Sequence, residues 1–144
     1  MQNAHAIGKL VVATFTDVVQ VKKTYDFPVF EIGRPLPALV VVYDGFEQEP
    51  MSQDSYLLKL RYECALYLPL ETQDVRKPWV EMQGLAGQLV DVFRDDPTLD
   101  DRVFAASLDA GEAVVHAPAD PHRKPIWIGH TFAVTVGVEE EEDD

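Results

Sequence analysis

The stretch from Tyr56 to Leu68, YLLKLRYECALYL, decides the fold. Every even-numbered residue in it is apolar, whereas Lys59, Arg61 and Glu63 occupy odd-numbered positions in between. Successive side chains of a β-strand point to opposite faces, so alternation of this length predicts a long strand with one apolar face. We expect the polar face of this strand to contact solvent or a partner.

Other stretches supply the rest of a sheet. Ile126 to Val138 alternates in the same way and predicts a second long strand. Ala38 to Tyr43, ALVVVY, is rich in β-branched residues and predicts a buried strand. Shorter strands are expected at 21–25, 103–108 and 112–116, with a turn at 109–111.

Two segments have the periodicity of amphipathic helices. Apolar residues recur every three or four positions at 4–20, and again from Trp79 to Phe93. Gly84 and Gly87 lie in the second segment, where each costs about 1 kcal/mol relative to alanine. We interpret them as a sign of close packing against the sheet or another subunit.

The order helix, strands, helix, strands has no βαβ rhythm. It predicts an α+β fold, with a largely antiparallel sheet and two main helices packed on one face. A chain of 144 residues suits one domain, which we place at 1–138. Glu139 to Asp144 are six consecutive acids whose charges repel one another, so they predict a disordered acidic tail. We expect loops at 26–37, 44–55 and 117–125, the last two of them exposed.

The charge balance argues against binding of nucleic acid. The formal net charge is −13, and the basic residues are scattered, with pairs such as Lys22-Lys23 and Arg123-Lys124. Phosphate neutralisation needs clustered cations, whereas an acidic surface is compatible with DNA sliding past it. No apolar run could span a bilayer, no secretion signal is expected, and the single Cys64 fits synthesis in a reducing cytoplasm.

No catalytic motif stands out, and we expect neither enzymatic activity nor a cofactor. Cys64 falls on the apolar face of its strand, where free cysteine usually behaves as a small hydrophobe. His116, Asp120 and His122 are the one hint of a metal site, but a structural zinc site wants four ligands and no cysteine is near. His130 lies among apolar neighbours and is interpreted as a hydrogen-bonded core or interface residue.

Four segments, in order, resemble parts of one protein family. They are LPALVV at 36–41, SYLLKLRYECALYLPLE at 55–71, DDPTL at 95–99 and GHTFAVTV at 129–136. Over nearly its whole length the chain resembles the tail terminator (tail completion) proteins of long-tailed bacteriophages.

This resemblance implies a structural protein of the virion tail or neck. It implies a ring, typically a hexamer, that caps the tail tube and contacts the tail tube protein on one side and the head-tail connector or adaptor on the other. DNA would pass through the lumen without specific binding, no membrane would be involved, and the family offers no catalytic residue.

Three alternatives stay open. The first is a head-completion or neck connector protein of the same phage class, or a minor protein associated with the tail tube; a connector would bind the portal or adaptor ring instead of the tail tube. A monomeric accessory binding module would form no ring. A small metal-dependent enzyme would use His116, Asp120 and His122.

The candidate interface residues follow from exposure and alternation alone. Arg61 and Glu63 lie on the polar strand face. The others lie in two expected loops, Gln48 and Glu49 in the first, Arg123 and Lys124 in the second.

Overall fold

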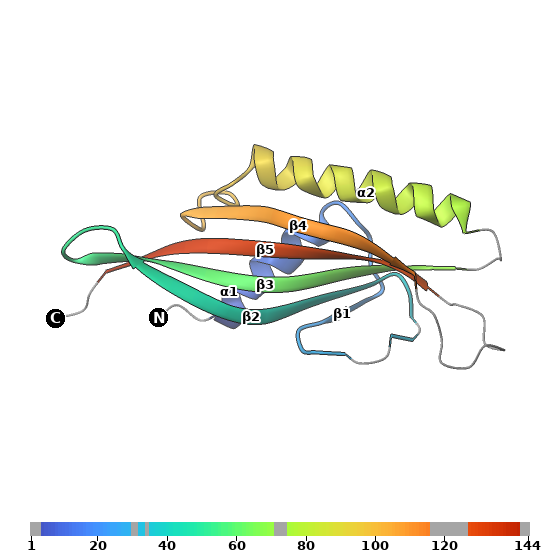
Figure 1. Cartoon of the computed structure of the whole chain (residues 1–144), viewed down its shortest axis with the longest axis horizontal. Helices are drawn as coiled ribbons and strands as arrows, with labels where there is room; N and C mark the ends of the chain where they lie inside the picture. The colour runs from blue at the N-terminus through green and yellow to red at the C-terminus, as the bar shows by residue number, and fades with distance from the viewer. Residues whose placement is uncertain (1–3, 30–31, 34, 71–74, 116–126, 142–144) are drawn as a thin grey trace.

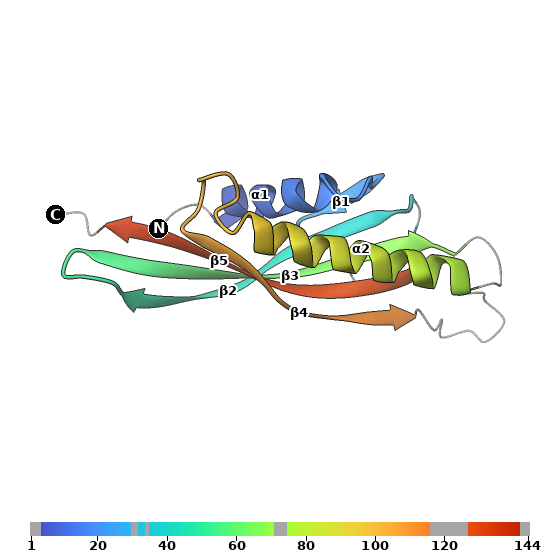
Figure 2. The same cartoon turned by 90° about the horizontal axis from the view of Figure 1, so that it is seen from above.

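The computed structural model describes residues 4–29, 32–33, 35–70, 75–115 and 127–141. This part of the chain folds into one mixed sheet with the strand order β1-β2-β3-β5-β4, in which only β1 and β2 are parallel. The elements are α1 (Ala4–Thr16), β1 (Lys23–Tyr25), β2 (Ala38–Pro50), β3 (Ser55–Pro69), α2 (Arg76–Asp95), β4 (Ala105–Val115) and β5 (Trp127–Glu141). Both helices lie on the same side of the sheet, so the predicted α+β class is confirmed (Figures 1 and 2).

The main core fills the space between the two helices and the sheet. The apolar face predicted for β3 is buried here, with Leu60 and Leu66 fully covered. Phe15 of α1 packs edge-to-face against Phe93 of α2 and Phe132 of β5, with ring centroids 5.9 and 5.4 Å apart. Such aromatic pairs contribute about 0.5–1.5 kcal/mol beyond their buried area, so Phe15 ties both helices to the sheet.

A smaller apolar cluster lies on the opposite face of the sheet, which we call the polar face because it carries Lys59, Arg61 and Glu63. Ile32 and Leu36 pack there with Trp127 and with the first residues of β2. The described part of the loop expected at 26–37 is therefore partly buried. It covers the end of the polar face where β2 begins and β5 begins.

The loop expected at 44–55 is mostly wrong, because only residues 51–54 lie between the two strands. β2 continues to Pro50 and stays paired with β3, across a bulge at Asp44, as far as the pair Pro50–Tyr56. The sequence hid this strand because neither described helix covers the outer part of the β2–β3 hairpin, so β2 is largely exposed on both faces here and shows no regular alternation (Figure 2). The proline is tolerated because it ends an edge strand.

Two further boundaries differ from expectation. The turn expected at 109–111 is a β-bulge at Asp109, and β4 runs unbroken from Ala105 to Val115. The acidic run does not begin a tail at Glu139, because β5 continues through Glu141, which pairs with Ser55. Backbone pairing does not depend on side-chain type, and residues 142–144 lie outside the described part.

Both edges of the described sheet are bulged. β1 pairs with β2 only as far as Val40, so the rest of β2 forms one edge and β4 forms the other. Asp44 is the extra residue in β2, and the adjacent Gly45 has φ +134°, which side-chain-bearing residues rarely adopt. Bulged edges pair poorly with other strands, so extension of the sheet by another chain is disfavoured.

Candidate interaction surface

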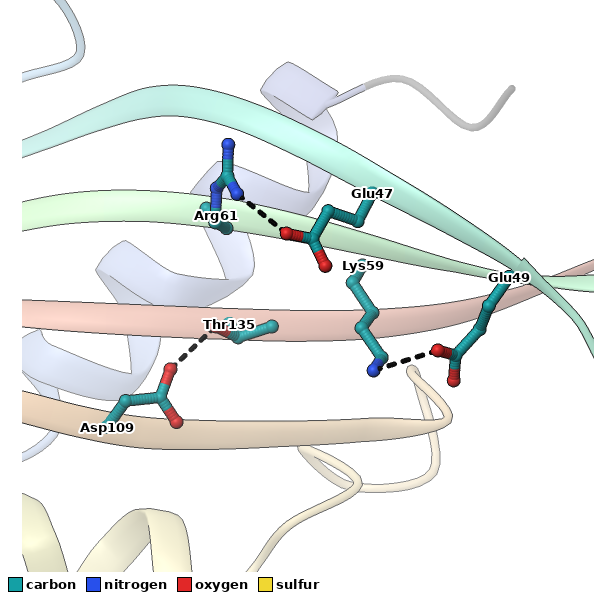
Figure 3. Close-up of polar contacts among 6 residues, drawn as sticks. All are labelled: Glu47, Glu49, Lys59, Arg61, Asp109 and Thr135. Carbon is teal, nitrogen blue, oxygen red and sulfur yellow. Dashed lines mark hydrogen bonds and ion pairs between the residues drawn. The ribbon is translucent and has the colours of Figure 1, made fainter.

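Ion pairs cross the polar face between β2 and β3. Arg61 Nη1 lies 3.1 Å from Glu47 Oε1, and Lys59 Nζ lies 3.2 Å from Glu49 Oε2 (Figure 3). Glu47 stands directly opposite Lys59 in the register, so both ion pairs run diagonally between the strands. All four side chains are more than a third exposed, and such pairs are worth only about 0–1 kcal/mol because water screens them.

The bulge in β4 places a carboxylate on the same face. Asp109 Oδ1 accepts a hydrogen bond from Ser107 Oγ, and Asp109 Oδ2 accepts one from Thr135 Oγ1, both at 2.6 Å. A bulge re-aims the side chains around it. Here the aimed side chain is held by hydroxyl donors on β4 and β5, and Figure 3 shows the one on β5, Thr135.

These side chains line a shallow groove of about 440 Å³. Apart from Leu57 and Phe104, its larger side chains are polar: Glu47, Lys59, Arg61, Ser107, Asp109 and Thr135. On the whole polar face, the described carboxylates outnumber the cations Lys23, Lys59 and Arg61: they are Glu47, Glu49, Glu63, Asp109, Glu112 and Glu139. The face is therefore hydrophilic and negatively charged on balance.

The predicted interface residues do not all come together. Arg61, Glu63 and Glu49 lie exposed on the polar face. Gln48 is exposed but belongs to β2 and points to the helix side, since it stands opposite the buried Leu58. The other candidates, Arg123 and Lys124, lie outside the described residues, as do His116, Asp120 and His122.

Two members of this surface, Glu47 and Asp109, are not among the predicted interface residues. The sequence predicts a loop at Glu47, although Glu47 and Glu49 have the i, i+2 spacing that puts both on one face of a strand. It predicts a turn at Asp109. No local signal distinguishes its bulge from a turn, because both use small and polar residues.

Cys64 and His130 are placed as expected. The Cys64 side chain is buried in the main core, and burial raises the pKa of its thiol well above the usual range. His130 is half-buried, stacks on Phe132 and donates from Nδ1 to the carbonyl oxygen of Thr131 at 2.8 Å. Within the described ranges, no group of three or more His, Cys, Asp or Glu side chains is arranged to hold a metal ion.

A second groove of about 430 Å³ lies between α1, β1 and β2. His5 Nδ1 stands 3.5 Å from Asp26 Oδ2 at its rim, and both side chains are more than half exposed. Tyr62 at its floor donates from its hydroxyl to the carbonyl oxygen of Ala4, and burial raises the pKa of that phenol. This tyrosine fixes the start of α1 on the sheet.

The chain was compared with models of protein families and with curated protein sequences. No family model and no curated protein matches it. Neither of the two described helices has the length and apolar content needed to cross a bilayer.

Proposed function

We propose that this chain is a structural protein of the virion of a long-tailed bacteriophage, a tail terminator that forms a ring, typically of six copies, on the end of the tail tube. It would contact the tail tube protein on one side and the head-tail connector on the other. Two lines of support are the sequence resemblance and the α+β fold with its long antiparallel sheet.

The observation that carries the proposal is the difference between the two faces of the sheet. One face is covered by both helices, whereas much of the other is exposed and bears more carboxylates than cations. A ring through which DNA passes needs a hydrophilic lumen that does not retain phosphate, and like charges repel. Under this proposal the polar face lines the lumen and the helices face outward.

Capping of the tail tube is the direct test. Tail tubes are assembled from the tail tube protein of the same genome and mixed with the purified chain. We expect the chain at one end of each tube, visible as a terminal ring by negative-stain microscopy. If the chain does not bind tube ends but binds the portal or adaptor ring, it is a neck connector and not a tail terminator. A chain that binds neither assembly would contradict both.

A further inference from the structure

A trough runs along β5 on the polar face of the sheet. The residues that form its floor are all small: Thr131, Ala133, Thr135 and Gly137. Longer side chains flank them on both neighbouring strands, with Lys59, Arg61 and Glu63 on β3 and Asp109 and Glu112 on β4. Neighbouring strands lie roughly 4.8 Å apart, so these two walls stand about 10 Å apart.

Two surface grooves follow one another along this trough. The groove of about 440 Å³ includes Thr135 and Gly137, and another of about 230 Å³ includes Thr131 and Ala133. Figure 3 shows the first of them, with Thr135 on β5 between the strands that carry Arg61 and Asp109. From Thr131 to Gly137 the trough is about 20 Å long at roughly 3.4 Å per residue, which is the length of an extended peptide of about seven residues.

The walls of the trough keep an excess of negative charge. The two cations on β3 are already matched, because Lys59 and Arg61 each form an ion pair with a glutamate of β2. Glu63 and Glu112 border the smaller groove, and both are exposed. Neither of them forms an ion pair with another residue of the described ranges. These two carboxylates are therefore open to a cation from outside the chain.

The spacing of the two carboxylates matches that of an extended chain. Glu63 stands level with Ala133, and Glu112 stands level with Thr131, two residues away along β5. This step is about 7 Å, which is also the distance between side chains at positions i and i+2 of an extended peptide. Two cationic side chains at alternate positions can therefore reach one carboxylate each. Arginine suits such contacts best, because its planar guanidinium group binds a carboxylate through two hydrogen bonds.

We propose that the trough is a docking site for an extended segment of a partner protein with arginine or lysine at alternate positions. Nucleic acid does not fit the site, because the same carboxylates repel phosphate. The segment comes from another protein, because the only cations at i and i+2 in this chain are Lys59 and Arg61, inside β3 itself. The inference goes beyond the proposed function and stands on the polar face alone. In the proposed ring, the bound segment would lie inside the lumen.

Binding of a synthetic peptide tests the site. The probe is a fluorescein-labelled peptide of about seven residues in which arginine alternates with serine. Fluorescence anisotropy is measured at about 0.15 M salt, where the Debye length of about 8 Å limits attraction by distant charges. We expect saturable binding to the native chain. Glu63→Gln with Glu112→Gln should weaken it about tenfold, because two exposed ion pairs are lost with little change in side-chain shape.

Two matched controls separate the trough from general attraction to a chain of net charge −13. Glu81→Gln with Asp91→Asn removes the same charge from exposed positions of α2, on the other side of the sheet, and should change affinity less than about twofold. Ala133→Phe fills the trough without changing its charge and should also weaken binding, whereas Ala133→Ser leaves the trough open and should not. Circular dichroism and thermal unfolding confirm that each variant is folded.

Equal affinities of the Glu63 and Glu112 double variant and the α2 control would overturn the site, because the net charge would then explain the binding. Full binding by Ala133→Phe would overturn it as well, since the peptide would lie elsewhere. A native chain that binds no peptide at about millimolar concentration would do the same. None of these results bears on the capping of tail tubes, which tests the proposed function separately.

Discussion

Arg61 and Glu47 face each other across β2 and β3, with Nη1 3.1 Å from Oε1, on the side of the sheet away from both described helices. Their side chains are 46% and 68% exposed, so this pair adds little to folding. A double-mutant cycle of Arg61→Gln and Glu47→Gln should give a coupling of about 0.2–1 kcal/mol in urea unfolding. A coupling above about 2 kcal/mol would mean that the pair is far better shielded from water than its exposure indicates.

Phe15 is the most sensitive position of the core. It is 1% exposed and contacts rings from the other helix and from the sheet. We expect Phe15→Ala to lower the free energy of unfolding by about 3–5 kcal/mol, because it removes buried surface and leaves a cavity. Phe15→Leu, the milder control, should cost clearly less when both are measured by urea unfolding. Equal losses would argue against a cavity at this site.

The glycines of α2 and β4 should respond in opposite ways to alanine. A Cβ at Gly84 or Gly87 would meet nothing within 4 Å, so they do not pack closely on the sheet as one interpretation of the sequence held. Each substitution there should stabilise the chain by up to about 1 kcal/mol in thermal unfolding. At Gly111 a Cβ would come within 2.4 Å of the Thr131 carbonyl oxygen, so Gly111→Ala should destabilise it. If Gly87→Ala stabilises the fold but blocks assembly, a second copy packs against α2.

We expect the buried thiol of Cys64 to make the fold less stable at alkaline pH. Burial raises the pKa of its thiol above the usual 9.0, so the folded chain keeps the proton where the unfolded chain loses it. The contribution of the buried, protonated thiol to the stability of the fold is therefore complete below pH 9.0. It is lost as the pH rises from there toward the pKa of the folded chain. Cys64→Ala should lose less stability than the native chain between pH 8 and about 10.5.

The same burial gives a simple check at one pH. With a thiol reagent at about pH 8, the native chain should react slowly and the urea-unfolded chain at once, because the thiolate is the nucleophile. Rapid reaction of the folded chain would mean that the strand face carrying Cys64 opens readily.

The sequence predicted the fold wherever one face of an element is buried. β3 and β5 alternate because the helices cover one side, and Cys64 and His130 were placed by that alternation. The prediction failed where no helix covers a strand, because no alternation of apolar and polar residues is then required. The outer part of β2 is largely exposed on both sides, and Glu139 to Glu141 extend β5 through backbone pairing alone.

The candidate surface was predicted only in part for a related reason. Arg61 and Glu63 could be assigned from β3 by itself, whereas Glu47 and Asp109 join them through strand register. Register is a long-range property, and each bulge shifts it by one residue.

Native mass spectrometry of the purified chain at low salt, over a range of concentrations, tests the central claim most directly. The account predicts a closed assembly of about six copies, with ring particles visible by negative stain. A mass that remains that of one 16.2 kDa chain at every concentration, together with tail tube ends that stay bare in its presence, would contradict it.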